Sequence, residues 1–141
     1  MLPETQNAIT WINTLLTTNA KQDKCRLGGP RTGFCCLGLG CYTLGIKYNT
    51  SDVASMQFKD AVGLKQVEGQ INYNGLDEKE SQEALSYLND HLNKSFVEIA
   101  HIILQNPDKY FYAQVAQGLK AHFQPQPKQK EALNDWAAIA G

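Results

Sequence analysis

The pattern of hydrophobic and polar positions predicts a helix at the start of the chain. Apolar side chains recur there at the three- and four-residue spacing of one helix face, with polar residues between them. Pro3 suits the first turn of such a helix, because the backbone N–H that proline lacks would have no partner there. We therefore expect a helix over residues 4–18, anchored in the core by Ala8, Trp11, Ile12, Leu15 and Leu16.

A glycine-rich stretch follows, and the hydrophobic pattern changes within it. Around Gly-Gly-Pro-Arg-Thr-Gly at residues 28–33, glycines that tolerate positive φ and a proline that fixes a turn predict two short strands within residues 20–36. From Cys35 to Leu44 almost every residue is apolar, which fits either a buried helix or a buried strand. We favour a helix because Leu37, Cys41 and Leu44 repeat at helical spacing.

The middle of the chain is more polar. Residues 46–60 have the composition of a loop, and the stretch 51–62 has room for one helical turn. Val67 and Ile71 flank Glu68-Gly69, a pair that suits the turn of a second hairpin. We therefore expect one or two short hairpins in all.

Capping patterns mark the helices of the second half. The Asp-x-x-Glu pattern at residues 77–80 predicts a helix that continues to about residue 91. The Ser-x-x-Glu capping box at residues 95–98 predicts a second helix, which ends before Pro107. Apolar residues at helical spacing predict a third helix over residues 108–123. The positions expected in the core are Ala84, Leu85, Leu88, Leu92, Phe96, Ile99, Ala100, Ile103, Phe111, Val115, Leu119 and Phe123.

These elements predict a single compact α+β domain with about five helices and one or two short β-hairpins. We place this domain at residues 1–123. A Gln-Pro-Gln-Pro run at residues 124–127 then interrupts the chain, and we expect residues 124–141 to form a proline-hinged C-terminal helix. That helix would dock on its own domain or on a neighbouring subunit, which favours a homo-oligomer. Its apolar face consists of Leu133, Trp136, Ala137 and Ile139.

Length, charge and hydropathy exclude several classes of protein. A chain of 141 residues is long enough for one hydrophobic core. Its formal net charge of −1 supplies no positive field that would attract duplex nucleic acid or anionic lipid. No apolar run approaches the ~18 residues of a membrane span, and the N-terminus has no cationic and apolar signal. We therefore expect a cytoplasmic protein with neither a membrane nor duplex nucleic acid among its partners.

Four cysteines, Cys25, Cys35, Cys36 and Cys41, lie close together in the sequence. Their even number permits disulfides, but without a secretory signal reduced thiols are favoured. A zinc site is disfavoured, because zinc-binding cysteines usually come in pairs separated by two to four residues, whereas the adjacent Cys35 and Cys36 would point in different directions. We interpret them as small buried hydrophobic residues, with no metal or cofactor. A cysteine–histidine pair in space remains an alternative, which would make the chain a small cysteine-dependent hydrolase.

The glycine-rich turn also carries a local concentration of positive charge. Arg26 and Arg31 bracket Gly28 and Gly29, and two lysines precede them with one acidic residue. Backbone N–H groups of such a turn can converge on an anion, and the planar guanidinium of arginine matches a phosphate group. Thr32 adds a hydroxyl group. We therefore predict an anion-binding site here, although a solvated turn whose glycines serve only its geometry explains the same residues.

Two residues of the second half are further candidates for this site. The amide of Asn89 could bind the edge of a base, although asparagine also suits the end of a helix. Tyr110 could stack on a ligand ring or cover apolar surface. We include both among the predicted ligand contacts, and we assign no catalytic residue and no metal ligand.

Several sequence blocks stand in a fixed order along the chain. They are Trp11 followed by a Leu-Leu pair, Lys-Gln at 21–22, Gly-Phe-Cys-Cys-Leu-Gly-Leu-Gly-Cys at 33–41, Phe-Lys-Asp-Ala-Val-Gly-Leu at 58–64, and Leu-Asn-Asp with Lys-Ser-Phe-Val-Glu-Ile-Ala-His-Ile-Ile within 88–103. Their order resembles that of a family of small proteins, mostly of unassigned function, from tailed phages and prophages. The resemblance covers roughly residues 8–105. Residues 106–141 look like an extension to which nothing carries over.

This resemblance implies a phage accessory protein that acts in the cytoplasm of a bacterial host. It brings no set of catalytic residues. Small phage proteins of this kind often resemble inhibitors of host defence, and one mode is a sponge that traps a phosphorylated nucleotide signal without cleaving it. Such a sponge is our leading hypothesis, because a cyclic oligonucleotide or an ADP-ribose derivative would suit the arginine–glycine turn. A protein–protein inhibitor or adaptor that acts on a host enzyme is the alternative, beside the hydrolase.

Overall fold

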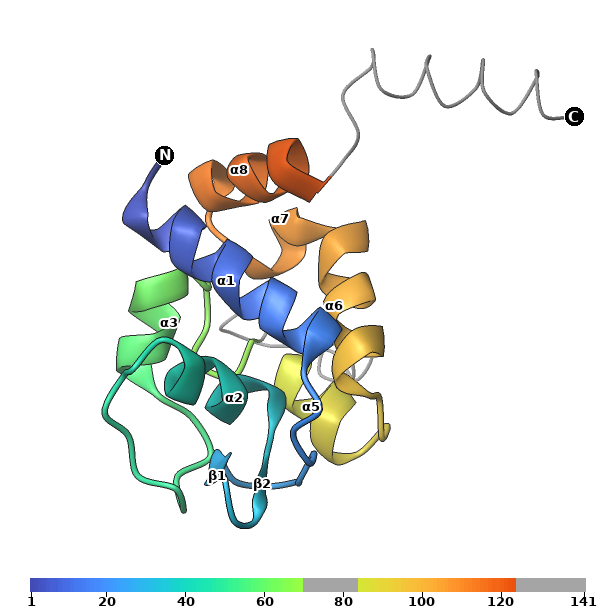
Figure 1. The fold of residues 1–141 in the computed structure, drawn as a ribbon. Helices are drawn as coiled ribbons and strands as arrows, with labels where there is room; N and C mark the ends of the chain where they lie inside the picture. Colours follow the sequence, from blue (N-terminus) through green and yellow to red (C-terminus); the bar gives the residue numbers. More distant parts are fainter. Residues whose placement is uncertain (70–83, 124–141) are drawn as a thin grey trace, which may run out of the picture.

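The computed structural model describes residues 1–69 and 84–123, and it confirms the expected α+β class (Figure 1). Seven helices and one antiparallel two-stranded hairpin lie in these ranges. Helix α1 crosses the middle of the molecule, with α8 over one end and the hairpin at the opposite end. The elements are α1 (Pro3–Thr17), β1 (Gly28–Gly29), β2 (Gly33–Phe34), α2 (Cys36–Thr43), α3 (Met56–Val62), α5 (Leu85–Asp90), α6 (Phe96–Gln105), α7 (Pro107–Tyr110) and α8 (Ala113–Phe123).

Helix α1 is the central element of the core. It begins one residue earlier than expected, with Pro3 in its first turn, and it contacts α2, α3, α6 and α8. Trp11 is fully buried, and its ring meets the ring of Phe58 edge to face at a centroid distance of 4.9 Å. The indole N–H of Trp11 donates to the carbonyl of Cys36 at 2.9 Å, which joins α1 to the start of α2. Each large apolar side chain buried here stabilises the fold by about 1.5–3 kcal/mol.

The expected hairpin and the expected buried helix after it are both confirmed. Gly28 pairs with Phe34 and Gly29 pairs with Gly33 across the two strands. Gly28 and Gly33 have φ values of 81° and 96°, which favour glycine because a Cβ is strained there. Helix α2 is buried from Cys36 to Cys41, which explains the apolar run, and it becomes exposed at Tyr42. At its start the Cys35 Sγ accepts a hydrogen bond from the Gly38 N–H.

Helix α3 is longer than the single turn that the sequence suggested. It is capped by the Ser55 hydroxyl, which accepts from the Phe58 N–H, and it ends at Gly63 in the left-handed conformation. The second hairpin and the capping pattern at 77–80 involve residues 70–83, which lie outside the described residues. Ala84 has extended backbone, so α5 begins at Leu85. Leu92, expected in the core, is 44% exposed, because the helix ends before it.

The capping box of α6 is confirmed, but the helix expected over 108–123 is broken. The Ser95 hydroxyl accepts from the Glu98 N–H, and the Glu98 carboxylate accepts from the Ser95 N–H. Phe111 has extended backbone between α7 and α8, and it forms an isolated bridge with Leu64. Tertiary pairing therefore outweighs helix periodicity at this point. The C-terminal helix expected over residues 124–141 lies outside the described residues.

Gly38 brings α2 against Leu27, in the segment that leads into the hairpin. A Cβ on Gly38 would lie 1.8 Å from the Leu27 carbonyl oxygen, whereas a Cβ on Gly29 would have its nearest neighbour, a Thr50 methyl group, at 3.5 Å. The atoms that a Cβ on Gly38 would meet belong to the backbone of Leu27, which cannot rotate away as a side chain can.

We predict that Gly38→Ala lowers the free energy of unfolding by about 3 kcal/mol, because overpacking outweighs the gain in helix propensity. Gly29→Ala should change it by less than about 1 kcal/mol. Urea unfolding followed by circular dichroism measures both. Equal midpoints for the two variants would contradict the close approach of α2 to Leu27.

Candidate functional site

The tip of the hairpin forms one wall of a shallow hollow. Arg31 and Thr32 are exposed there. The hollow has a volume of about 360 Å³ and is completed by Thr50, which comes from the loop after α2. The residues that line this hollow are Gly29, Pro30, Arg31, Thr32 and Thr50. Sequence analysis proposed Gly29, Arg31 and Thr32 as ligand contacts but gave no sign of Thr50.

A second hollow of about 600 Å³ shares Thr50 with the first. Backbone hydrogen bonds place this loop beside the hairpin, because the Gly28 N–H donates to the Thr50 carbonyl at 2.9 Å and the Leu27 N–H donates to the Asp52 carbonyl at 2.6 Å. We call the two hollows together the Thr50 groove. The second hollow is lined by Lys47, Tyr48, Asn49, Thr50, Asp52 and Gln57.

Charge in and near the Thr50 groove differs from the sequence expectation. Arg26 is paired with Asp23, with its Nη2 3.0 Å from the carboxylate Oδ2. The Lys24 N–H and the Arg26 guanidinium both lower the pKa of Asp23. Within residues 1–69 and 84–123, neither Arg31 nor Lys47 has an ion-pair partner. Among the residues that line the Thr50 groove, the cations free for an anion are therefore Arg31 and Lys47, and Lys47 is the cation that sequence reasoning missed.

Backbone amides of the turn contribute less than we expected. The N–H groups of Leu27 and Gly28 donate to the loop after α2, and the Thr32 N–H donates to the Gly29 carbonyl at 3.3 Å. The Tyr48 hydroxyl donates to the Gly28 carbonyl at 2.7 Å. These bonds build the turn into the fold. An anion in the Thr50 groove would be held mainly by side chains.

Asn89 lies in the interior, away from any ligand surface. It is 1% exposed, and both ends of its amide are occupied. Its Oδ1 accepts from the Gln22 side chain at 2.8 Å and from the Cys36 N–H at 3.1 Å. Its Nδ2 donates to the Asp23 carbonyl at 2.9 Å and to the Asp90 carboxylate at 2.8 Å. Asn89 therefore joins α5 to the segment before the hairpin and to the start of α2.

Tyr110 is also buried, with 1% of its surface exposed. It lies at the end of α7, and its backbone carbonyl accepts from the Lys65 N–H at 2.9 Å. Neither Tyr110 nor Asn89 lines the Thr50 groove. Of the predicted contacts, the structure brings together Gly29, Arg31 and Thr32.

The cysteines fall into one exposed and three buried thiols, all of them free. Cys25 is exposed. Burial raises the pKa of Cys35 to about 12 and that of Cys41 to about 11, and it raises the pKa of Cys36 well above its usual value. Within the described parts of the chain, no three His, Cys, Asp or Glu residues gather as they would around a metal ion. The buried thiols thus remain protonated near neutral pH.

Comparison with known proteins adds no assignment to this geometry. No family model matches the chain, and no curated protein and no solved structure matches it either. None of the helices in residues 1–69 and 84–123 combines the length and apolar character needed to cross a lipid bilayer. The functional argument therefore depends on the residues of the Thr50 groove.

We predict that Asn89→Ala lowers the free energy of unfolding by roughly 2–4 kcal/mol, because the buried N–H of Cys36 and the other groups bonded to the amide lose their partner. Asn13→Ala is the matched control, since Asn13 is exposed on α1 and alanine favours a helix. Thermal and urea unfolding measure both variants. A loss no larger for Asn89→Ala than for Asn13→Ala would show that the buried amide does not hold these segments.

We also predict that one thiol in the folded protein reacts rapidly with Ellman's reagent at pH 8 and that Cys25→Ser removes this reaction. The other three thiols are shielded and protonated, so they should react only after denaturation. Absorbance at successive times counts the thiols released in each state. A second rapid thiol in the native protein would contradict the burial of Cys35, Cys36 and Cys41.

Proposed function

We propose that this chain is a non-catalytic binding protein that sequesters a phosphorylated nucleotide signal in the Thr50 groove. In the setting that the resemblance to phage proteins implies, it would act in the bacterial cytoplasm and block a host defence that depends on that signal. The observation that carries the proposal is the pair of hollows that share Thr50, with the uncompensated cations Arg31 and Lys47 among their lining residues.

The chemistry of the groove suits a phosphate at its Arg31 end. The guanidinium of Arg31 offers paired N–H donors that match two phosphate oxygens, and the Thr50 hydroxyl adds a neutral donor. The Thr32 hydroxyl donates to the Gly33 carbonyl at 3.3 Å and would have to turn from it to reach the ligand. Asp52 lies in the other hollow and would repel a phosphate there. We therefore assign the primary phosphate to Arg31 and a weaker, second anionic contact to Lys47.

Tyr48 is the aromatic residue that lines the groove, and we assign it the contact with a base in place of Tyr110 and Asn89. Its ring is half-buried, and its hydroxyl is fixed by the bond to the Gly28 carbonyl. An anchored ring presents a surface for stacking without a further loss of side-chain freedom. The volumes of the two hollows also fall in the range of small-molecule sites.

The state of the thiols supports binding without chemistry. A thiol nucleophile must ionise, and burial opposes this at Cys35, Cys36 and Cys41. Cys25 does not line the groove. A captured ligand would therefore be released unchanged, as sequestration requires.

We predict that the protein binds a cyclic oligoadenylate or ADP-ribose and that Arg31→Ala weakens this binding by about tenfold, since a charge-assisted hydrogen bond contributes about 1.5–3 kcal/mol. Lys47→Ala should weaken it less, and the double variant most. Isothermal titration calorimetry measures the affinities, and mass spectrometry of ligand recovered after denaturation tests whether it is intact.

Arg26→Ala is the matched control, because it removes the same charge from a residue that is already paired with Asp23. It should leave the affinity within about twofold of the parent, given that surface ion pairs are weak. Equal losses of affinity for Arg26→Ala and Arg31→Ala would mean that binding depends only on the net charge of the protein and not on Arg31 itself. Cleaved ligand, or no binding to either class of nucleotide, would overturn the proposed function.

A further inference from the structure

The second hollow of the Thr50 groove holds a carboxylate that the phosphate contacts do not explain. Asp52 lines this hollow, and within residues 1–69 and 84–123 its side chain has neither an ion pair nor a hydrogen bond. Lys47 lines the same hollow without pairing with Asp52. Because like charges repel, Asp52 weakens the binding of an anionic ligand unless it contacts another part of that ligand.

Asn49 lies beside Asp52 across a tight turn. The Asp52 N–H donates to the Asn49 carbonyl at 3.1 Å. Such a bond closes a four-residue turn, in which the first and last Cα atoms lie within about 7 Å of each other. The Asn49 Oδ1 accepts from the N–H of Ser51 at 3.1 Å and from its hydroxyl at 2.8 Å. These two bonds fix the side-chain amide and leave its Nδ2 to donate to a ligand.

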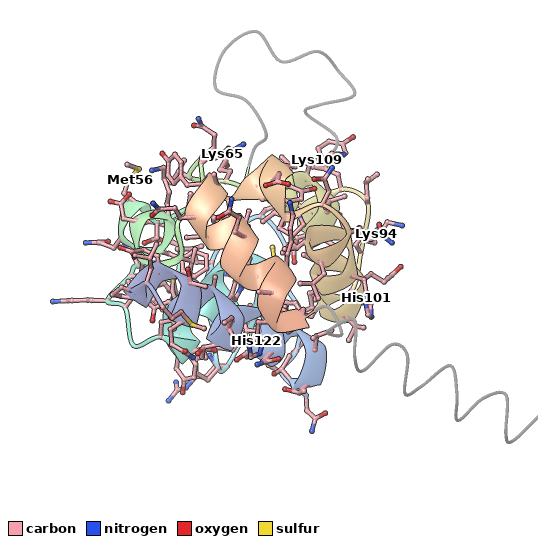
Figure 2. The ribbon with its side chains drawn as sticks, turned by 90° about the horizontal axis from the view of Figure 1, so that it is seen from above. Met56, Lys65, Lys94, His101, Lys109 and His122 are labelled. Carbon is pink, nitrogen blue, oxygen red and sulfur yellow. The ribbon has the colours of Figure 1, made fainter. Side chains whose placement is uncertain are left out.

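The polar groups around this hollow therefore have distinct roles. An ionised carboxylate such as that of Asp52 accepts hydrogen bonds and donates none, whereas the amide of Asn49 has only donors left. Tyr48 offers its ring, because its hydroxyl is already bonded to backbone. Figure 2 shows Met56 at the start of α3, on the edge of the molecule. The next residue, Gln57, lines the hollow with an amide that can donate or accept.

We propose that Asp52 and Asn49 make the Thr50 groove selective for guanine over adenine, an inference that rests on the proposed function because it concerns the base of the same ligand. The pairing edge of guanine carries two adjacent donors, N1–H and the 2-amino group, with the O6 acceptor beside them. The two donors match the two oxygens of the Asp52 carboxylate, and O6 can accept from the Asn49 Nδ2. Adenine offers Asp52 one donor, its 6-amino group, and its N1 acceptor repels the second carboxylate oxygen.

Contact with the edge of the base is compatible with stacking of its face. A base stacked on Tyr48 directs its polar edge sideways, and Asn49 and Asp52 follow Tyr48 in the same loop and line the same hollow. An adenine nucleotide keeps the stacking surface and the phosphate contacts. It should therefore still bind, but more weakly than the guanine nucleotide with the same phosphates.

The test compares cyclic dinucleotides that differ only in the base, by isothermal titration calorimetry on the full chain. We expect cyclic diguanylate to bind about tenfold more tightly than cyclic diadenylate, since a bidentate contact with a base commonly discriminates by at least that factor. Cyclic diinosinate lacks the 2-amino group and should lie between them. Asp52→Asn keeps the size of the side chain but replaces one acceptor by a donor, so it should bring the guanine and adenine affinities within about twofold of each other.

Asp60→Asn is the matched control, because it removes the same charge from an exposed residue of α3 that does not line the Thr50 groove. It should leave the ratio of the guanine and adenine affinities unchanged, and circular dichroism should show both variants folded. The ratio is the decisive quantity, since a change in net charge affects the two ligands alike.

Equal affinities of the parent protein for the guanine and adenine forms would overturn the selectivity and leave the proposed function standing. A ratio that Asp52→Asn does not change would show that Asp52 does not contact the base. If none of the three cyclic dinucleotides binds, this inference fails, and the binding of ADP-ribose then decides whether the proposed function fails with it.

Discussion

The side-chain amide of Asn89 is the interaction on which the front half of this structure depends. It accepts from Gln22 and Cys36 and donates to Asp23, so it joins three segments that are distant in sequence. No local propensity brings such segments together, and bringing them together opposes chain entropy. The segment that enters the hairpin and the helix that leaves it are both fixed at this point. The position of the Thr50 groove therefore follows from a buried residue that does not line it.

Close backbone packing explains much of the glycine content of residues 28–40. Gly38 lets α2 meet the Leu27 carbonyl, and a Cβ on Gly40 would lie 2.4 Å from the ring of Phe58. Gly28 and Gly33 supply the positive φ angles of the hairpin. Because glycine has no side chain, neighbouring elements can come into direct contact at these positions, as the dense packing of a protein interior requires. The same glycines at first suggested an anion-binding turn, and their amides largely serve the fold.

Local patterns in the sequence predicted the elements whose causes are local. The Ser95–Glu98 capping box and the apolar face of α1 involve residues within one or two turns of each other, so their structure follows from spacing. Phe111 shows the limit, because the helical pattern assigned it correctly to the core while its pairing with Leu64 broke the helix.

The candidate site was also predictable only in part, because some of its residues are neighbours in sequence and others are brought together only by tertiary contacts. Arg31 and Thr32 adjoin the glycine turn in sequence, and they lie together in space. Thr50 and its loop, which also carries Lys47, reach the site because the carbonyls of Thr50 and Asp52 accept from the Gly28 and Leu27 N–H groups, and no sequence spacing encodes these bonds. Asn89 has the same amide whether it binds a base or a backbone, and burial alone separates the two roles.

The shape of the Thr50 groove restricts the kind of ligand that the proposed function allows. Arg31 and Lys47 are exposed, so each loses side-chain entropy when it binds and competes with water for the anion. A single phosphate at one end would therefore bind weakly. A ligand that carries two anionic groups and a ring between them would engage Arg31, Tyr48 and Lys47 together, and the second contact would form within a complex that already exists. Because backbone bonds hold the hairpin and the loop side by side, such a ligand would not have to order the site as it binds. Tight sequestration by this surface thus requires a bridging polyanion, which a nucleotide with more than one phosphate is.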